Sequence, residues 1–201
     1  MAVSAPSSPF GKSEDQFSAG TMGLWFFLAA LAVLFASTVL GYSVIRLGAG
    51  SEATVGLPAL PNGLWLSTAV LLASSGTMHW AILSIRNNRP HQLKFGMLAT
   101  IVLGVLFLAM QTRCWVQWAA PLAAALSQTQ TRFILTGFYV LTGTHALHVI
   151  GGLIPLTVVT MRAARGYYSP TYYPGIRYCA MYWHFLDVVW LVLFATLLLG
   201  T

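Results

Sequence analysis

The chain has 201 residues, of which 57% are hydrophobic and 7% are charged, and its mean hydropathy is +0.74. Soluble domains carry about a quarter charged residues, so this composition excludes a water-soluble fold. The formal charge of +6 is carried by few residues near the ends of apolar runs, which is typical of membrane topology and argues against nucleic-acid binding. We therefore expect an all-α, polytopic membrane protein.

Five apolar runs divide the chain, and each exceeds the ~20 residues that a helix needs to cross a bilayer. They lie at about 21–45, 63–85, 95–118, 133–161 and 178–199. Runs of this length satisfy their own backbone hydrogen bonds as helices, so a bundle of five transmembrane helices is predicted. Residues 1–20 form an N-terminal tail without the apolar core of a signal peptide, and residues 21–201 form the transmembrane domain.

The Lys and Arg residues are unevenly divided between the two ends of the predicted bundle. One end carries Lys12, Arg86, Arg89, Lys94, Arg162, Arg165 and Arg177, and the other carries Arg46, Arg113 and Arg132. The positive-inside rule places the richer end in the cytoplasm. The N-terminal tail is then cytoplasmic, and five crossings put the C-terminus on the opposite side of the membrane.

Asp187 is the one acidic residue that lies within a long apolar run. The other acids, Glu14, Asp15 and Glu52, fall in expected loops or tails. A carboxylate at membrane depth is costly, so it should face protein or a cavity and have a partner. His184 is its i,i+3 neighbour on a helix. The pair indicates either a structural lock between helices or a proton or ligand site, and we favour the structural interpretation.

Two more imidazoles, His145 and His148, stand at the same i,i+3 spacing in the fourth apolar run. With His184 and Asp187 they make four groups that could meet inside a bundle. Such a set can bind a metal, but metal-binding bundles use more carboxylates than the one available here. We predict a hydrogen-bonded polar network between two helices and no metal site, while lipid headgroup contact or a proton-linked role stays open.

The second apolar run is rich in small hydroxylated residues, which let helices approach each other closely. These are Ser67, Thr68, Ser74, Ser75 and Thr77, with Gly76 and His79 beside them. No acid or base lies nearby in the sequence to activate a serine. We therefore predict a packing role for these residues and no catalytic residue on this chain.

Two prolines mark expected irregularities in the helices. Pro155 frees the carbonyl of Gly151, so a tilted or kinked helix is expected there. Gly151 and Gly152 should allow a neighbouring helix to approach closely. Pro121 is expected to end the third helix.

Aromatic and basic side chains commonly anchor a membrane protein at the lipid interface. On this basis one set of residues is predicted to contact lipid or a neighbouring subunit. It comprises Trp25, Trp65, Trp80, Trp183 and Trp190, with Arg86, Arg89, Arg162 and Arg165. Acyl chains are expected near the first three Trp residues and phospholipid headgroups near the Arg residues.

Two stretches are more specific than generic membrane sequence. Residues 137–151 read GFYVLTGTHALHVIG and resemble the FYxxTGxHxxHVxxG signature of cytochrome c oxidase subunit III. Residues 182–190 read YWHFLDVVW, which is similar to that family's YWHFVDVVW. Weaker similarities occur in order upstream, so the resemblance covers the chain from about residue 20 to its end.

The resemblance implies a short, five-helix bacterial form of subunit III in the plasma (inner) membrane, with a periplasmic C-terminus. Subunit III of this family belongs to a heme–copper oxidase, which reduces O2 to water and pumps protons in the aerobic respiratory chain. It has no catalytic centre, because heme and copper lie on partner subunits, and it binds phospholipid in a cleft. Its main partner is subunit I, in a complex that also contains subunit II and an optional small subunit IV.

Three positions depart from the family pattern. The family usually carries Glu where this chain has Leu31, Cys114 and Arg177. Leu31 cannot titrate, so the resemblance does not carry a proton-antenna role to that position. The scaffold and lipid roles depend on shape and on the His and Asp residues, which are kept.

Other functions remain compatible with the same features. A subunit-III-like component of a quinol oxidase or a nitric oxide reductase would share the motifs. A small membrane transporter, or a membrane enzyme with its own metal at the three His residues and Asp187, would use the polar groups differently.

Overall fold

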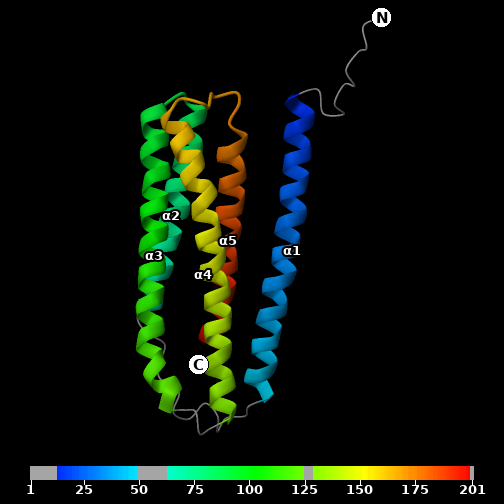
Figure 1. The fold of residues 1–201 in the computed structure, drawn as a ribbon, viewed down its shortest axis with the longest axis vertical. Helices are drawn as coiled ribbons and strands as arrows, with labels where there is room; N and C mark the ends of the chain where they lie inside the picture. The colour runs from blue at the N-terminus through cyan, green and yellow to red at the C-terminus, as the bar shows by residue number, and fades with distance from the viewer. Residues whose placement is uncertain (1–12, 49–62, 125–128, 200–201) are drawn as a thin grey trace, which may run out of the picture.

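The computed structural model describes residues 13–48, 63–124 and 129–199, and these form five helices (Figure 1). The helices are α1 (Ser13–Gly48), α2 (Gly63–Arg86), α3 (Pro90–Ala124), α4 (Thr129–Ala164) and α5 (Pro174–Leu199). The described ranges contain no β-strand, only an isolated bridge between Ser169 and Tyr172. All five helices are long and apolar enough to span a membrane, so the predicted all-α, multi-pass fold is confirmed.

Four helices, α1, α3, α4 and α5, begin earlier than the apolar pattern predicts, and two of these starts have a local reason in the sequence. α1 begins at Ser13, inside the predicted tail, because serine followed by Glu14 and Asp15 suits a helix N-terminus. α3 begins at Pro90, inside the predicted basic hinge, because proline suits the first helical turn. α3 also continues past Pro121, its predicted end, since a proline so close to a helix terminus disturbs only the last turns.

α2 and α4 end in the same way at the same end of the bundle. Asn88 and Gly166 both adopt a left-handed conformation, with φ of 53° and 78°. The backbone N–H of Asn88 donates to the carbonyl of Ile85 (3.1 Å). That of Arg89 donates to Ser84 (2.9 Å), and equivalent bonds close α4. These Schellman turns satisfy carbonyls that a helix end leaves unpaired and redirect the chain into the next helix.

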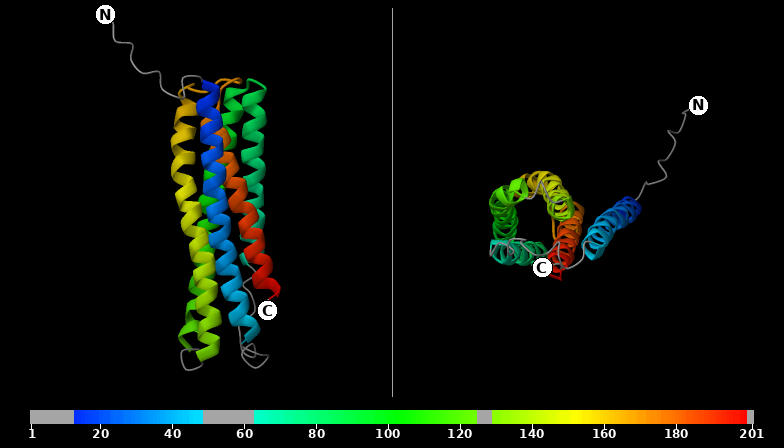
Figure 2. Two further views of the ribbon diagram at one scale, coloured as in Figure 1. Left: turned by 90° about the vertical axis from the view of Figure 1, so that its right-hand side faces the viewer. Right: turned by 90° about the horizontal axis from the view of Figure 1, so that it is seen from below.

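Helices α2 to α5 form a four-helix ring, and α1 lies outside it (Figures 1 and 2). The end view in Figure 2 shows α3 and α5 at opposite corners, each between α2 and α4. Among the described helices, α1 packs only against α4 and α5. The start of α1 and the turns after α2 and α4 lie at one end of the bundle, so the three segments predicted to be cytoplasmic share one side.

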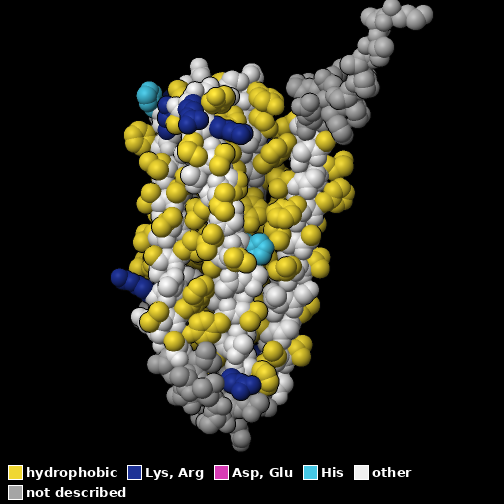
Figure 3. Space-filling model, in the orientation of Figure 1, with side chains coloured by type: hydrophobic (Ala, Val, Ile, Leu, Met, Phe, Trp, Pro, Cys, Tyr) yellow, Lys and Arg dark blue, Asp and Glu magenta, His cyan; other side chains and the backbone are white. Residues whose placement is uncertain are grey.

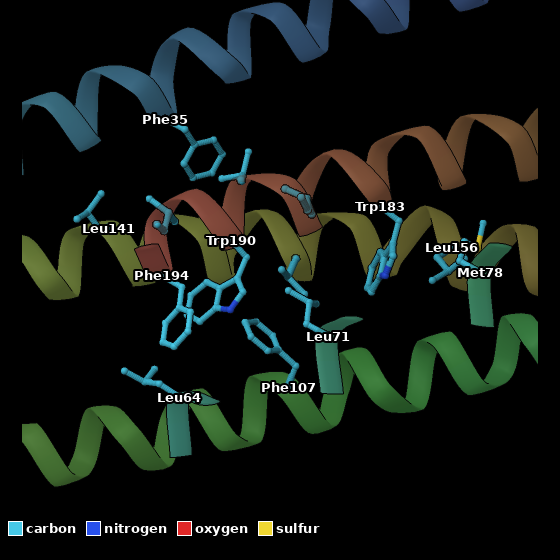
Figure 4. Packing of buried hydrophobic residues seen from close by; sticks show 14 of the residues in the cluster. Phe35, Leu64, Leu71, Met78, Phe107, Leu141, Leu156, Trp183, Trp190 and Phe194 are labelled. Atoms are coloured by element: carbon cyan, nitrogen blue, oxygen red, sulfur yellow. The ribbon is translucent and has the colours of Figure 1, made fainter. Parts of the chain in front are cut away.

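The interior of the ring is filled by large side chains from all four helices (Figure 4). Trp190 of α5 is fully buried and meets Phe107 of α3 edge to face, with ring centroids 5.0 Å apart. Trp183 is also buried, and its ring lies against Gly104 of α3. An added Cβ at Gly104 would come within 2.8 Å of the indole, so the absence of a side chain allows these helices to pack this closely.

α4 continues without interruption through Pro155. The predicted close approach of a neighbouring helix occurs at Gly152, where an added Cβ would lie 2.7 Å from the Tyr182 ring of α5. Gly151 instead has nothing within 4 Å of an added Cβ. One glycine of the pair therefore serves helix packing, and the other borders open space.

The outer surface is apolar along the helices and basic near their ends (Figure 3). Exposed large apolar side chains occur on all five helices, including Phe26, Leu98 and Val188. Most Lys and Arg side chains seen in Figure 3 gather at the end that carries the α2–α3 and α4–α5 turns. This distribution suits a protein whose middle contacts hydrocarbon and whose ends contact headgroups.

Candidate functional site

Two buried indoles of α5 donate hydrogen bonds to hydroxyl groups of α2. Trp190 Nε1 donates to Thr68 Oγ1 (2.9 Å), and Trp183 Nε1 donates to Ser74 Oγ (3.0 Å). Each hydroxyl in turn donates to a carbonyl one turn earlier in α2, at 2.8 and 2.6 Å. The indoles and hydroxyls thus satisfy one another inside the ring, and these small residues of α2 serve helix packing, as predicted.

A polar group at the middle of the same two helices contains Ser75, His184 and Asp187. Ser75 Oγ lies 2.7 Å from His184 Nδ1, and Asp187 Oδ2 lies 3.6 Å from the same nitrogen. The longer distance is an electrostatic contact rather than a hydrogen bond. In a catalytic triad the serine and the carboxylate bind opposite nitrogens of the imidazole, whereas here both face Nδ1. The arrangement therefore differs from a triad, and its short contact joins α2 to α5 through Ser75 and His184.

His145 is fully buried among aromatic rings near the centre of the protein. Its ring centroid lies 5.1 Å from that of Trp190, 5.9 Å from Phe107 and 6.2 Å from Phe35 of α1. Within the described ranges neither ring nitrogen has a hydrogen-bond partner. His145 therefore packs chiefly as an aromatic ring between the ring of helices and α1.

His148 lies where α1, α4 and α5 meet. Its Nδ1 is 2.8 Å from the carbonyl of Thr144 in its own helix, and its ring meets Phe35 of α1 edge to face at 5.1 Å. Its backbone carbonyl accepts a hydrogen bond from the Tyr182 hydroxyl of α5 (3.0 Å). This residue thus links three helices through one ring contact and one backbone bond.

The structure therefore places the four predicted network residues in three different surroundings. In the part of the chain that is described, no hydrogen bond joins His145 or His148 to Asp187. The His184 side chain makes its hydrogen bond with Ser75 of α2, whereas the predicted partner helix was α4. The same part of the chain holds no cluster of three or more His, Cys, Asp or Glu side chains with the geometry of a metal site. Helix order explains the difference, because α5 lies between α2 and α4 and the sequence does not reveal which neighbour a side chain meets.

An apolar groove of about 470 Å³ lies between α1, α4 and α5. Leu24 and Phe27 of α1 line one wall, and Gly151, Tyr178 and Tyr182 line the other. The missing side chain of Gly151 leaves this space open. The groove therefore has the lining that an acyl chain or an apolar side chain requires.

A more polar hollow of about 570 Å³ adjoins the start of α5. Its lining includes Phe17, Thr171 and the exposed Arg177. The Arg177 guanidinium lies 5.1 Å from the Phe17 ring centroid, a cation–π distance. Phe17 also stacks on Tyr178 (5.9 Å), which lines the apolar groove. A basic hollow and an apolar groove thus lie on either side of one aromatic pair.

A family model described as "Cytochrome c oxidase subunit III" matches residues 20–200 of this chain. The chain belongs to the cytochrome c oxidase subunit III family. The match includes all of α2 to α5, most of α1 and both motifs singled out in the sequence.

Curated relatives of this subunit III chain carry the name "Cytochrome c oxidase subunit 3". The relative from Synechocystis sp. is 34% identical over 174 residues, which cover 86% of this chain and 72% of the relative. Those from Drosophila melanogaster and Gallus gallus are 37% and 36% identical over 133 and 132 residues. These animal alignments cover 66% of this chain, and the chain spans about half (48%) of the length of these relatives.

The five tryptophans of this subunit III chain that were predicted to contact lipid or a subunit divide into two classes. Trp25, Trp65 and Trp80 are 60%, 58% and 43% exposed, as a lipid or subunit contact requires. Trp183 and Trp190 are 2% and 0% exposed, so their predicted place at a lipid or subunit surface is corrected to the interior of the ring. The reason is their spacing of seven residues, which places both on the core-facing side of α5.

The cationic residues predicted to meet headgroups lie at the end of subunit III that carries the helix turns. Arg86, Arg89, Arg162 and Arg165 are exposed there. Arg86 Nε donates to the Tyr173 hydroxyl (3.1 Å) across the two turns. Burial raises the pKa of the nearby Tyr168 phenol above its ordinary value, and the Arg162 guanidinium partly offsets this effect.

The departures from the family pattern fall in different environments. Leu31 and Cys114 are buried, whereas Arg177 is exposed. Gln111 of α3 belongs to the weaker upstream similarities to the family, three residues before Cys114. It is buried, and its amide has no hydrogen-bond partner among the residues described.

Proposed function

We propose that this chain is the non-catalytic subunit III of a bacterial respiratory heme–copper oxidase. The observation that carries the proposal is the family match over residues 20–200 on a five-helix membrane fold. The complete complex would transfer electrons to O2, form water and pump protons. Heme and copper would be held by partner subunits.

The proposed role of this chain is to stabilise subunit I, its main partner, next to subunit II and an optional small subunit IV. The hydrogen bonds of the His- and Trp-containing motif of α5 support this role. They join α5 to α2 and orient His184, without the geometry of an activated nucleophile. A rigid helical ring is what a supporting subunit requires.

We propose further that the subunit binds phospholipid along α1. The apolar groove between α1, α4 and α5 suits an acyl chain, and the hollow beside Arg177 suits an anionic headgroup. Charged headgroups are attracted to exposed Arg side chains near the membrane surface. Native mass spectrometry of the purified complex would detect the bound lipid, and an Arg177→Glu variant should lose it.

The proposed location is the bacterial plasma membrane, with a cytoplasmic N-terminus and a periplasmic C-terminus. The excess of Lys and Arg at the end shared by the α2–α3 and α4–α5 turns supports this orientation. Cysteines introduced near Glu52 and Gln128, which lie outside the described residues, should react with an impermeant maleimide from the periplasm. Reaction from the cytoplasm alone would reverse the orientation.

Co-purification tests the family role most directly. An affinity tag on this chain should recover heme-bearing subunits, detected by their absorbance and by mass spectrometry. Recovery of the chain without heme proteins, from membranes in which the oxidase is active, would contradict the proposal.

A further inference from the structure

A polar notch lies at the seam between α2 and α5, which are neighbours in the ring (Figure 2). We define this α2–α5 notch by Ser75, His184 and Asp187. Ser75 lies midway along α2, and His184 lies about 15 Å along α5 from Pro174. Both helices are long and apolar enough to span a membrane, and both residues lie well inside them. The notch is therefore within the expected hydrocarbon core.

The bonding within the notch leaves one nitrogen of His184 available. Nδ1 lies 2.7 Å from Ser75 Oγ and 3.6 Å from Asp187 Oδ2, so the notch itself occupies this nitrogen. Nε2 has no hydrogen-bond partner among the described residues. The His184 side chain is 36% exposed, whereas that of Asp187 is 6% exposed. The notch thus presents a polar nitrogen at its surface and holds an enclosed carboxyl group beneath it.

Hydrocarbon cannot satisfy a polar nitrogen within the membrane, because acyl chains carry neither a hydrogen-bond donor nor an acceptor. Polar side chains within the hydrocarbon core therefore face protein or water rather than lipid tails. Neither Asp187 oxygen has a hydrogen-bond partner within the described ranges, so the enclosed carboxyl group also lacks a partner. Both groups call for a protein partner with hydrogen-bonding side chains.

The surface around the notch suits a helix. Leu72 of α2 and Val188 of α5 are exposed apolar residues at 46% and 61%. Ala73 and Gly76 of α2 are exposed small residues, and an added Cβ at Gly76 would meet nothing within 4 Å. Small residues allow the backbone of another helix to approach closely in a membrane.

We propose that the α2–α5 notch receives a transmembrane helix of another subunit of the oxidase, whose hydroxyl side chain, which can donate or accept, binds His184 Nε2. The proposal rests on the proposed function, because it requires that this chain assembles with other membrane subunits. It adds the surface and the chemistry of that contact. The partner helix supplies the hydrogen-bonding group that lipid lacks, and its backbone packs on the small residues of α2.

The test uses the assembled complex with a photo-reactive amino acid at position 188, one turn after His184. Position 140 on α4 is the matched control, because Val140 is also exposed, at 51%. Illumination should attach another oxidase subunit at position 188 and not at position 140.

In a second experiment, Val188→Trp should lower the amount of this chain retained with the heme subunits after detergent extraction roughly tenfold, a factor that corresponds to about 1.4 kcal/mol. Val140→Trp should leave retention unchanged.

The outcomes separate this inference from the proposed function. Failure of the unmodified chain to co-purify with heme subunits would overturn both. Normal co-purification with attachment only to lipid at position 188, and normal retention of Val188→Trp, would overturn the notch alone. Attachment at position 188 to a second copy of this chain would also overturn it.

Discussion

In the most apolar stretch of α1, 17% of the residues are buried, whereas the corresponding share in α5 is 44%. Both stretches are strongly apolar, with mean hydropathy of 2.2 and 1.8. α5 lies between two ring helices and also contacts α1, whereas α1 packs on one side of the ring (Figure 2). Hydropathy therefore predicts that a helix enters the membrane, but it does not predict what share of its residues is buried against other helices.

α1 and the ring of α2 to α5 also differ in the contacts that hold their helices in place. The ring contains buried indole–hydroxyl hydrogen bonds between α2 and α5. α1 is held by inserted side chains, of which Phe35 is 3% exposed and packs against His145 and His148, and by a part-buried hydrogen bond from the Tyr178 hydroxyl of α5 to the Phe17 carbonyl (3.0 Å). In a membrane, where lipid is as apolar as a side chain, such packing and hydrogen bonding decide which helices stay together. We therefore expect α1 to separate from the ring more easily than the ring comes apart.

The largest expected effect is loss of the ring through Trp190→Ala. The change removes a fully buried indole, its bond to Thr68 and its contact with Phe107. Removal of a buried aromatic residue costs about 3–5 kcal/mol. Thermal unfolding in detergent should occur at a much lower temperature. Trp25→Ala is the control, since Trp25 of α1 is 60% exposed, and an equal loss in both variants would remove the distinction between the regions.

A smaller effect is expected from Phe35→Ala, which should release α1 and leave the ring intact. The change removes the phenyl ring that packs edge to face against His145 and His148. The cost should be at or below the lower end of the ~3–5 kcal/mol range, because α1 can shift to fill the space. Cysteines at Leu24 and Gly151, which line the groove from α1 and α4, should then cross-link less efficiently with a bismaleimide.

The control for this experiment is a cysteine pair inside the ring. An added Cβ at Gly96 would lie 3.0 Å from that of Ala81, so Gly96→Cys and Ala81→Cys should form a disulfide after a small adjustment. This disulfide should form equally well with Phe35 or Ala at position 35. Loss of both cross-links would mean that α1 and the ring fold as one unit.

Asp187 tests whether the polar group of α5 is structural. Asp187→Asn keeps the shape and a polar group beside His184, whose Nδ1 lies 3.6 Å from Asp187 Oδ2, whereas Asp187→Ala keeps neither. Loss of a buried polar partner costs about 1–3 kcal/mol. The Asn variant should retain assembly and O2 turnover, and the Ala variant should lose this subunit on detergent extraction. Normal assembly of the Asn variant with collapsed proton uptake would show that Asp187 is proton-active.

The smallest expected effect comes from Ser75→Ala, which removes the 2.7 Å contact with His184 Nδ1. One such hydrogen bond contributes about 1 kcal/mol. Ser37→Ala in α1 removes a hydroxyl that bonds only to the carbonyl of Val33 in an exposed position, and this change should be close to neutral. Equal unfolding temperatures for the two variants would indicate that the α2–α5 contact adds no stability.

The helices and the family could be predicted from the order of the residues alone. Long apolar runs predict five spans because a membrane-embedded backbone must bond to itself, and the start of α2 at Gly63 agrees with that prediction. The boundaries of α1 and α3 were less accurate, because Ser13 and Pro90 are favourable helix starts that lie outside the apolar runs. The motifs at 137–151 and 182–190 indicated the subunit III family, which the match over residues 20–200 shows.

Which helix each polar side chain contacts is known from the arrangement of the helices in space and could not be predicted from the sequence. The i,i+3 spacing places His184 and Asp187 on one side of α5. Both α2 and α4 carry polar residues that this side could contact, so the spacing does not predict which helix it faces. The ring order places Ser75 beside His184 and encloses His145 among Phe35, Phe107 and Trp190. Periodicity is a property of one helix, whereas partner choice depends on the packing of several, and that information is not local in the sequence.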